Sequence, residues 1–401
     1  MSWRNKYREL AKEAISKPPQ YGVDVDITQF TPKEVDKNLD LHSVADILEN
    51  VGVSVDSTNR AGEYYQLESI VLERLSKVPG LEIMSLEEAI DTYGKDLEPY
   101  FWNAVKVDTD KFTALAELAG KGGYFVRAKK GHRIQVPVQA CLLMQLNQSL
   151  QAPHNIIIAE EGSEVSVVTG CTVMRETTGL HAGITEIYVK KGARVSFVMI
   201  HRWSEAMHIR PRTGVIVEEG GEYISNYIAF TKLKTFQSMP RVILHENARA
   251  YLASTIVLEG QAKSDSGYTL ELAGNNASGQ IISRAITKDF SELTTRAKIT
   301  GLALGVRGHI DCQGLLLSDK SRILTIPILD ALHDNVTLTH EAAVGKLAED
   351  KILWLMARGF SRENAESILV RGFLRVDLPS LPPAVTSMID NTMRLIAKSI
   401  L

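Results

Sequence analysis

Cysteine is scarce in this sequence. Its 401 residues include three cysteines, Cys141, Cys171 and Cys312, which are odd in number and lie far apart. This argues against a disulfide framework and indicates free thiols. A permanently bound iron-sulfur cluster usually needs four thiolates, several of them in C-x-x-C spacing, and the sequence has neither the number nor the spacing. A ferredoxin-like electron carrier is therefore excluded.

An excess of positive charge and long apolar runs are lacking as well. The formal net charge is -3, no stretch approaches the roughly 18 apolar residues of a spanning helix, and the segment MSWRNKYRELAKEAISK has no apolar core of a signal peptide. We therefore expect a cytoplasmic protein that binds neither nucleic acid nor membrane. The Walker A pattern is also missing, so any ATPase activity is expected in a separate chain.

The pattern of apolar residues divides the chain into three zones. The chain is 44% apolar and 23% charged, so it can bury a large core. We predict a helical N-terminal domain over residues 1–120, because apolar residues recur there at helical spacing in two stretches: Tyr7, Leu10, Ala11 and Ile15, then Leu67, Ile70, Val71 and Leu75.

Short β-branched runs replace the helical pattern over residues 121–335. Four of them, HNIIIA from 154, EVSVVT from 164, ITEIYVK from 184 and RVSFVMI from 194, are typical of strands. Turn pairs recur with offsets of 30, 28, 27 and 29 residues, at Gly162-Ser163, Gly192-Ala193, Gly220-Gly221, Asn247-Ala248 and Asn276-Ala277. This period favours a β-solenoid, whose coils cover their apolar faces by stacking. An antiparallel sandwich is the alternative.

Helical patterning returns over residues 336–401, which we predict to be a C-terminal helical domain. Apolar positions from Leu347 to Met356 indicate a first helix, and a second is expected from Arg362 to Val370 with Gly372 as its stop. A third is expected over about 384–401, after prolines that fall in the preceding linker.

Three stretches resemble the SufB/SufD family of the SUF system, on which iron-sulfur clusters are built: VVTGCTV over 167–173, HIDCQGLLLSD over 309–319, and THEAAVGKLAEDKILWLMARGFSRENAESILVRGF over 339–373. The resemblance implies a right-handed parallel β-helix between two helical domains, in agreement with the three zones. It also implies a dimer with a second SufB/SufD-type chain, here a second copy of the same chain, and binding of the ABC-type ATPase SufC to the C-terminal helices. The chain is then a scaffold and not an enzyme.

The resemblance also implies roles for four residues. Cys312 matches the SufB cysteine of the cluster assembly site, and His340 and Glu341 match the family's His-Glu-Ala motif. Such mixed ligands, shared between subunits, would hold a transient iron-sulfur cluster weakly enough for release. Cys171 matches the SufB position that accepts persulfide sulfur. SufD chains typically lack the Cys and Glu together, so the chain is identified as SufB-like, although Thr339 replaces a carboxylate found in some SufB chains.

A sulfur path from Cys171 to Cys312 would run through the β-helix interior, where the family carries polar residues. Trp203 matches the family's tunnel tryptophan, whereas His201 and Arg202 replace its Gln and Asn. His201 could still relay protons or sulfur. The alternative is a surface loop, because the polar residues His201, Arg202, Ser204 and Glu205 lie almost consecutively.

Each candidate also has a purely structural interpretation. Cys312 and Cys171 could be small buried hydrophobes on strands, His340 could be a structural histidine, and Glu341 could be a carboxylate in the first turn of a helix, where the dipole favours it. The remaining groups are interpreted as packing or surface residues, although the two histidines among them could add imidazole ligands at the same interface: Cys141, His309 and His333.

Three other functions compete with the cluster scaffold. A SufD-like subunit would hold the complex together without its own cluster, and Cys312 with Glu341 speaks against it. A carbohydrate-active β-helix enzyme would need clustered carboxylates along one face and usually a secretory signal, and neither is found. A purely structural interaction module is opposed only by the Cys and His-Glu positions.

Overall fold

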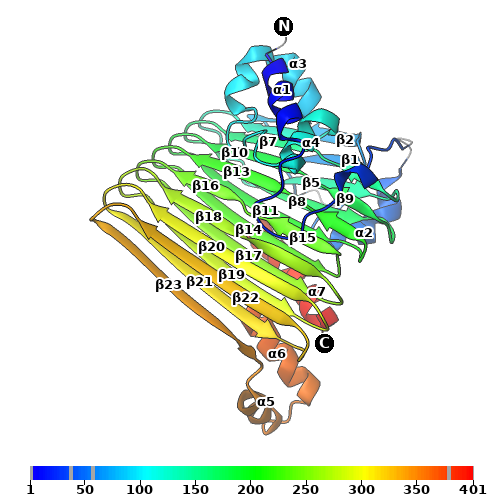
Figure 1. The fold of residues 1–401 in the computed structure, drawn as a ribbon, viewed down its shortest axis with the longest axis vertical. Helices are drawn as coiled ribbons and strands as arrows, with labels where there is room; N and C mark the ends of the chain where they lie inside the picture. The colour runs from blue at the N-terminus through cyan, green and yellow to red at the C-terminus, as the bar shows by residue number, and fades with distance from the viewer. Residues whose placement is uncertain (1–2, 36–38, 56–58, 377–380, 401) are drawn as a thin grey trace.

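The computed structural model describes residues 3–35, 39–55, 59–376 and 381–400. Its centre is a parallel β-solenoid of about 8 turns with helices toward both ends of the chain, and Figure 1 shows the coils stacked along one axis. The predicted solenoid is confirmed and the antiparallel sandwich is wrong, because successive coils pair in parallel.

Sheet one is a ten-stranded wall of the solenoid. Its pairs are parallel except for the hairpin of β2 and β1 at one edge. In spatial order it contains β2 (Ile70–Ser76), β1 (Gly62–Leu67), β5 (Val138–Met144), β8 (Glu164–Val173), β11 (Arg194–Arg202), β14 (Glu222–Thr231), β17 (Arg249–Leu258), β19 (Ser278–Thr287), β21 (Val306–Leu316) and β23 (Val336–Lys346).

Sheet two forms the facing wall and changes shape along the axis. In the early coils it is split into two series of short strands. One series is β3 (Leu81–Ser85), β4 (Tyr124–Ala128), β7 (His154–Ala159), β10 (Ile184–Val189), β13 (Arg212–Val217) and β16 (Arg241–Leu244); the other is β6 (Ser149–Gln151), β9 (Gly179–His181), β12 (Met207–Ile209) and β15 (Thr235–Ser238). Both series end on β18 (Lys263–Leu272), which β20 (Glu292–Gly301) and β22 (Arg322–Ala331) continue. The early coils are therefore three-sided and the late coils two-sided.

The turns between coils depend on residues that tolerate a left-handed backbone. Gly162 has φ of 67° and Asn247 has φ of 55°, a region open to glycine and, among other residues, mainly to Asn and Asp. The other predicted turn pairs contain a residue of the same conformation, so the sequence period of the turns is the period of the coils.

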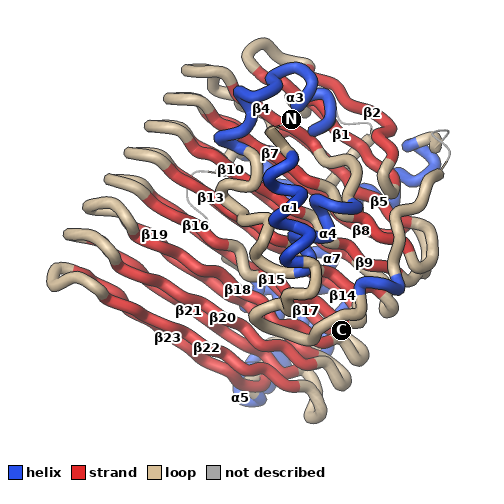
Figure 2. Tube along the Cα trace, turned by 45° about the horizontal axis from the view of Figure 1, so that its top comes forward, coloured by secondary structure: helices blue, strands red, loops and turns tan. Residues whose placement is uncertain are grey.

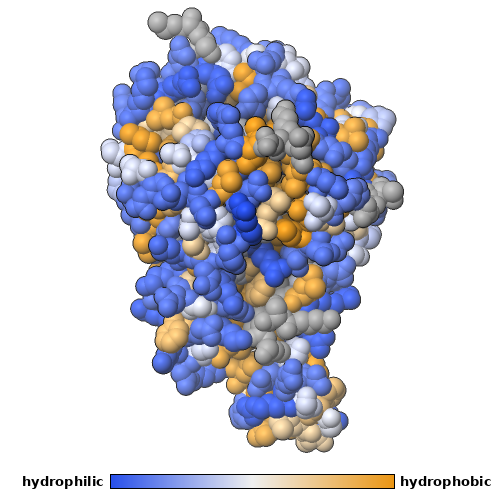
Figure 3. All heavy atoms as spheres, turned by 90° about the vertical axis from the view of Figure 1, so that its right-hand side faces the viewer, coloured by the Kyte–Doolittle hydropathy of each residue, from blue (hydrophilic) through white to orange (hydrophobic). Residues whose placement is uncertain are grey.

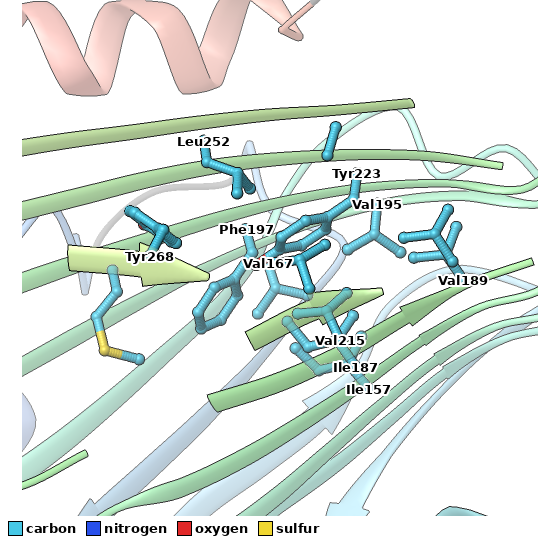
Figure 4. Close-up of a cluster of buried hydrophobic side chains, with 14 of the residues drawn as sticks. Ile157, Val167, Ile187, Val189, Val195, Phe197, Val215, Tyr223, Leu252 and Tyr268 are labelled. Carbon is cyan, nitrogen blue, oxygen red and sulfur yellow. The ribbon is translucent and has the colours of Figure 1, made fainter. Parts of the chain in front are cut away.

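Apolar rows fill the interior. Ile157, Ile187 and Val215 occupy one register position on successive strands of sheet two, and Val167 and Phe197 do so on sheet one. Figure 4 shows these side chains meeting between the sheets. Burying one such side chain stabilises the fold by about 1.5–3 kcal/mol, and each coil obtains this burial from its neighbours.

Helices cover the outward faces of the coils. Sheet two is covered by α1 (Asn5–Ala14), α3 (Leu86–Tyr93), η3 (Gly94–Tyr100) and α4 (Lys111–Ala119). Sheet one is covered by η2 (Leu41–Val44), α2 (Ala45–Glu49), α6 (Arg362–Leu374) and α7 (Pro383–Ile400). Two described helices remain. One is η1 (Ile27–Gln29), in the segment that links α1 to η2, and the other is α5 (Glu349–Met356), which protrudes at one end (Figures 1 and 2).

Three predictions about elements are wrong. The stretch with Leu67, Ile70, Val71 and Leu75 is the β1–β2 hairpin and not a helix, because β1 pairs with β5 and joins the solenoid. Residues 336–346 form β23, so the solenoid continues past 335 and the helices begin at α5. Gly372 lies inside α6, which continues to Leu374.

A buried carboxylate anchors the N-terminal region to sheet two. Glu186 is fully buried and accepts hydrogen bonds from four successive backbone N–H groups, residues 102–105, at 2.6–3.1 Å, and it lies 2.8 Å from His154 Nε2. We predict that Glu186→Ala lowers the free energy of unfolding by about 3 kcal/mol, because the donors lose their acceptor. Chemical denaturation measures this. The matched control Glu218→Ala, which removes a half-exposed partner of Lys190, should cost under about 1 kcal/mol; equal losses would refute the anchoring role.

Candidate functional site

Three buried side chains that can ligate or transfer protons meet inside the early coils. Cys171 on β8 and His201 on β11 are register partners and therefore point the same way. His181 lies on β9, the short third side of the coil, and faces them. All three are buried, and one ligand atom from each lies within 4.8 Å of the others. His181 was not among the residues predicted from the sequence.

Hydrogen bonds fix the orientation of His181. The amide nitrogen of Gln151 donates to the carbonyl oxygens of Glu68 (3.0 Å) and Leu143 (2.9 Å). Gln151 Oε1, 2.9 Å from His181 Nδ1, is therefore an acceptor, and Nδ1–H donates to it. The lone pair of the neutral ring is consequently on Nε2 of His181.

His201 is held by aromatic neighbours. Its Nδ1 lies 2.7 Å from the Tyr227 hydroxyl, and its ring lies edge-on to those of Tyr227 and Trp203. Its Nε2 and the indole nitrogen of Trp203 are buried and have no hydrogen-bond partner among the described residues. His201 and Trp203 are thus interior groups, whereas Arg202 between them is exposed. The surface-loop alternative is therefore wrong for His201, although Glu205 does lie in an exposed turn.

Burial keeps this cluster uncharged at neutral pH. It raises the pKa of the Cys171 thiol well above its usual value. It lowers the pKa of His181 to about 3 and that of His201 well below its usual value. The site therefore combines a protonated thiol with two neutral imidazoles, and neutral imidazole is the form that accepts a proton or binds a metal ion.

A row of hydroxyl groups leads from this cluster toward Cys312. Tyr227, Ser254, Ser283 and Cys312 occupy one inward-facing register position on β14, β17, β19 and β21. The two serine hydroxyls are hydrogen-bonded at 3.3 Å, and Tyr227 bonds His201. At about 4.8 Å per strand, the five steps from β8 to β21 span roughly 24 Å. Polar side chains thus occupy one inward-facing row between the Cys171–His201 cluster and Cys312.

Cys312 is 1% exposed and lies in the second-last strand of sheet one. Burial, with a smaller contribution from Asp311, raises the pKa of its thiol to about 12. The last strand, β23, pairs with β21 so that His340 is opposite Ile310 and Glu341 is opposite Asp311. His340 therefore shares the inward face with Cys312, whereas Glu341 is on the outward face.

One chain consequently does not bring all three predicted ligands to one side of the sheet. Both His340 and Glu341 are exposed on β23. The helix-dipole interpretation of Glu341 is wrong, because the residue lies in a strand. On the outward face, Thr339 bonds His309 at 2.8 Å, and His333 lies in the turn before β23.

Cys141 lies apart from both sites. It is on β5, where it pairs with Gly170, and its side chain belongs to the outward cluster beneath α2. Burial raises the pKa of its thiol. The residue is therefore a matched control for Cys171, because it is equally buried on the neighbouring strand but faces the opposite side.

The helix α5 and the turn after it carry exposed apolar side chains beyond the solenoid. Four large apolar side chains of α5 and the following turn are 38–57% exposed; we call them the apolar tip: Leu353, Trp354, Met356 and Phe360. In Figure 3 apolar side chains gather at this protruding end, which is lowest in the view. No helix in the described parts of the chain is long and apolar enough to span a bilayer.

Comparison with known proteins gives a consistent family. Residues 142–373 match the family model described as "SUF system FeS cluster assembly, SufBD core domain". A protein of Methanothermobacter thermautotrophicus is 38% identical over 96% of this chain and 98% of its own length. One from Archaeoglobus fulgidus is 41% identical over 88% and 95%, and one from Pyrococcus horikoshii is 32% identical over 95% and 89%. All three are described as iron-sulfur cluster assembly SufBD family proteins.

Proposed function

Because the chain belongs to the SufBD family of iron-sulfur cluster assembly proteins, we propose that it is a SufB-like scaffold on which a labile cluster is built and released. The observation that carries this proposal is the inward-facing polar row that lies between the Cys171–His201 cluster and Cys312. A SufD-like structural subunit would have no use for such a row. The chain itself is proposed to have no ATPase activity.

Sulfur would enter at Cys171. Its thiolate attacks the outer sulfur of a donor persulfide R–S–SH, the donor S–S bond breaks, and the donor leaves as a thiolate that takes up the proton of Cys171. The imidazoles of His181 and His201 are the nearest titratable neighbours in this cluster, with one ligand atom of each of the three residues within 4.8 Å of the others. Because the thiol is fully buried, the coil around it has to open locally for the donor to reach it.

Sulfide would then move along the polar row. Two thiols of a reductant cleave the persulfide, becoming a disulfide and returning Cys171 to the thiol, and one hydrogen sulfide is released. The hydroxyls of Tyr227, Ser254 and Ser283 can donate hydrogen bonds to the hydrosulfide anion at each coil. Cys312 lies where the row ends.

The cluster would form at the open end of the solenoid, between two chains. β22 and β23 are edge strands, and exposed edges with apolar side chains favour pairing with another chain. Large apolar side chains there are 40–63% exposed: Leu324, Ile328, Leu332 and Val344. A second copy would cover this end and add its own inward-facing His340. It would also supply its own Glu341, which within one chain lies on the outward face, away from Cys312.

The apolar tip is the proposed docking surface for a SufC-type ATPase. We predict that Leu353→Glu with Trp354→Glu weakens association by about tenfold or more, since exposed apolar anchors dominate such interfaces. Pull-down and calorimetry with the ATPase measure this. Phe290→Glu, which changes a 55% exposed side chain in a solenoid turn, is the control and should bind normally. Unchanged binding by the double variant would refute the docking surface.

Anaerobic reconstitution with ferrous iron, sulfide and a thiol reductant tests the scaffold function. The wild type should bind iron and acid-labile sulfide, show sulfur-to-iron charge-transfer absorption, and pass the cluster to an apo-ferredoxin. Failure to bind iron, or retention of the cluster in the presence of the acceptor, would contradict the proposal.

A further inference from the structure

We propose that Cys171, His181 and His201 form a site for a divalent metal ion of the series from iron to zinc, inside the three-sided coils. The site is distinct from the open end of the solenoid, because five strand steps separate β8 from β21. The proposal does not rest on the proposed function, since metal binding is measured without sulfur transfer.

The donor set is almost closed around one point. Ligand atoms of the three residues lie within 4.8 Å of one another, and donors in a tetrahedral site with two nitrogens and one sulfur are about 3.3–3.6 Å apart. Rotations that move each donor by about an ångström would complete the site. The three residues come from β8, β9 and β11, which the coil register fixes relative to one another.

Each imidazole has the outer support that metal-binding histidines use. His181 Nδ1–H donates to Gln151, which in turn donates to two backbone carbonyls. His201 Nδ1 bonds the Tyr227 hydroxyl at 2.7 Å. Such partners fix the ring and direct the other nitrogen toward the ion. On His201 that other nitrogen is buried and has no hydrogen-bond partner among the described residues.

The chemistry of the donors selects the ion. One thiolate and two imidazoles suit iron(II), cobalt(II) and zinc(II), whereas magnesium and calcium prefer carboxylate and water oxygens. Three protein ligands leave the fourth position open, as in sites that bind an exchangeable ligand. The ion with one thiolate carries a net charge of about +1, so a small anion such as hydrosulfide at the fourth position would neutralise the buried site.

Anaerobic titration of the reduced, chelator-treated full chain with cobalt(II) tests the site, each addition being followed until the absorption is constant. The wild type should bind one equivalent with thiolate-to-cobalt charge-transfer absorption and the strong visible bands of tetrahedral cobalt. Cys171→Ser should lose the charge-transfer band, and His201→Gln should weaken binding by roughly tenfold or more. Cys141→Ala should bind as the wild type does.

X-ray absorption on cobalt-loaded wild type makes the test independent of whether the variants fold. One sulfur and two imidazole ligands are expected. Absence of a thiolate band, a band that persists in Cys171→Ser, a band lost in Cys141→Ala, or a coordination shell of oxygen and nitrogen alone would overturn the proposal.

Discussion

Cys312→Ala is expected to abolish cluster formation in anaerobic reconstitution, with acid-labile sulfide falling by about tenfold or more. Cys312 is the only cysteine of the described chain near the open end, so its loss leaves imidazole and carboxylate ligands alone. These bind iron-sulfur clusters far more weakly than thiolate. Visible absorption with iron and sulfide analysis measures the effect.

The controls for this experiment come from the same sequence. Cys141→Ala removes an equally buried thiol on the outward face of sheet one and should reconstitute as the wild type does. His340→Ala and Glu341→Ala test the two exposed residues of β23 separately, because the strand places them on opposite faces. Undiminished charge-transfer absorption in Cys312→Ala would show that the cluster forms elsewhere and would favour the SufD-like role.

Cys171→Ser is expected to abolish sulfane uptake. After incubation with a persulfide donor and removal of the donor, the wild type should retain one sulfane sulfur on Cys171, and the variant none, because a serine hydroxyl does not form a stable bond to sulfane sulfur under these conditions. Intact-protein mass and peptide mapping measure this. Reconstitution with free sulfide should be unchanged, since it bypasses the entry point.

A variant that still takes up sulfane sulfur would contradict the entry role of Cys171, and so would sulfur that maps to Cys141 or Cys312 in the wild type. Cys141→Ala is again the matched control, because its thiol lies on the neighbouring strand and should have no effect on uptake.

Much of the solenoid was predictable from the sequence because local and long-range signals agree there. The β-branched runs from 154, 164, 184 and 194 are strands. The turn residues need the left-handed conformation that Gly and Asn tolerate. Where local and long-range signals disagree, pairing with a neighbouring strand determines the structure. The β1–β2 hairpin has apolar residues at helical spacing, but β1 pairs with β5. Strand β23 contains helix-favouring Ala and Glu, but it pairs with β21.

The site was predictable only in part. Cys171 and Cys312 were found by resemblance, but His181 was missed because no local motif marks it. The coil period could have pointed to His181, because it lies 30 residues after Gln151 and pairs with it in register. The same period places Ser254, Ser283 and Cys312 at steps of 29 residues. The opposite facing of His340 and Glu341 follows only once β23 is known to be a strand.

Isotope tracing tests the interior path most directly. Cys171 is loaded with a sulfur-34 persulfide, excess donor is removed, and ferrous iron, reductant and excess unlabelled sulfide are added. Delivery through the polar row predicts that the bound cluster is richer in sulfur-34 than the bulk sulfide. Ser254→Val with Ser283→Val should lower that enrichment to the bulk value, while Thr255→Val, whose side chain lies beneath α7 on the outward face, should preserve it. Equal labelling of cluster and bulk sulfide in the wild type would contradict the account.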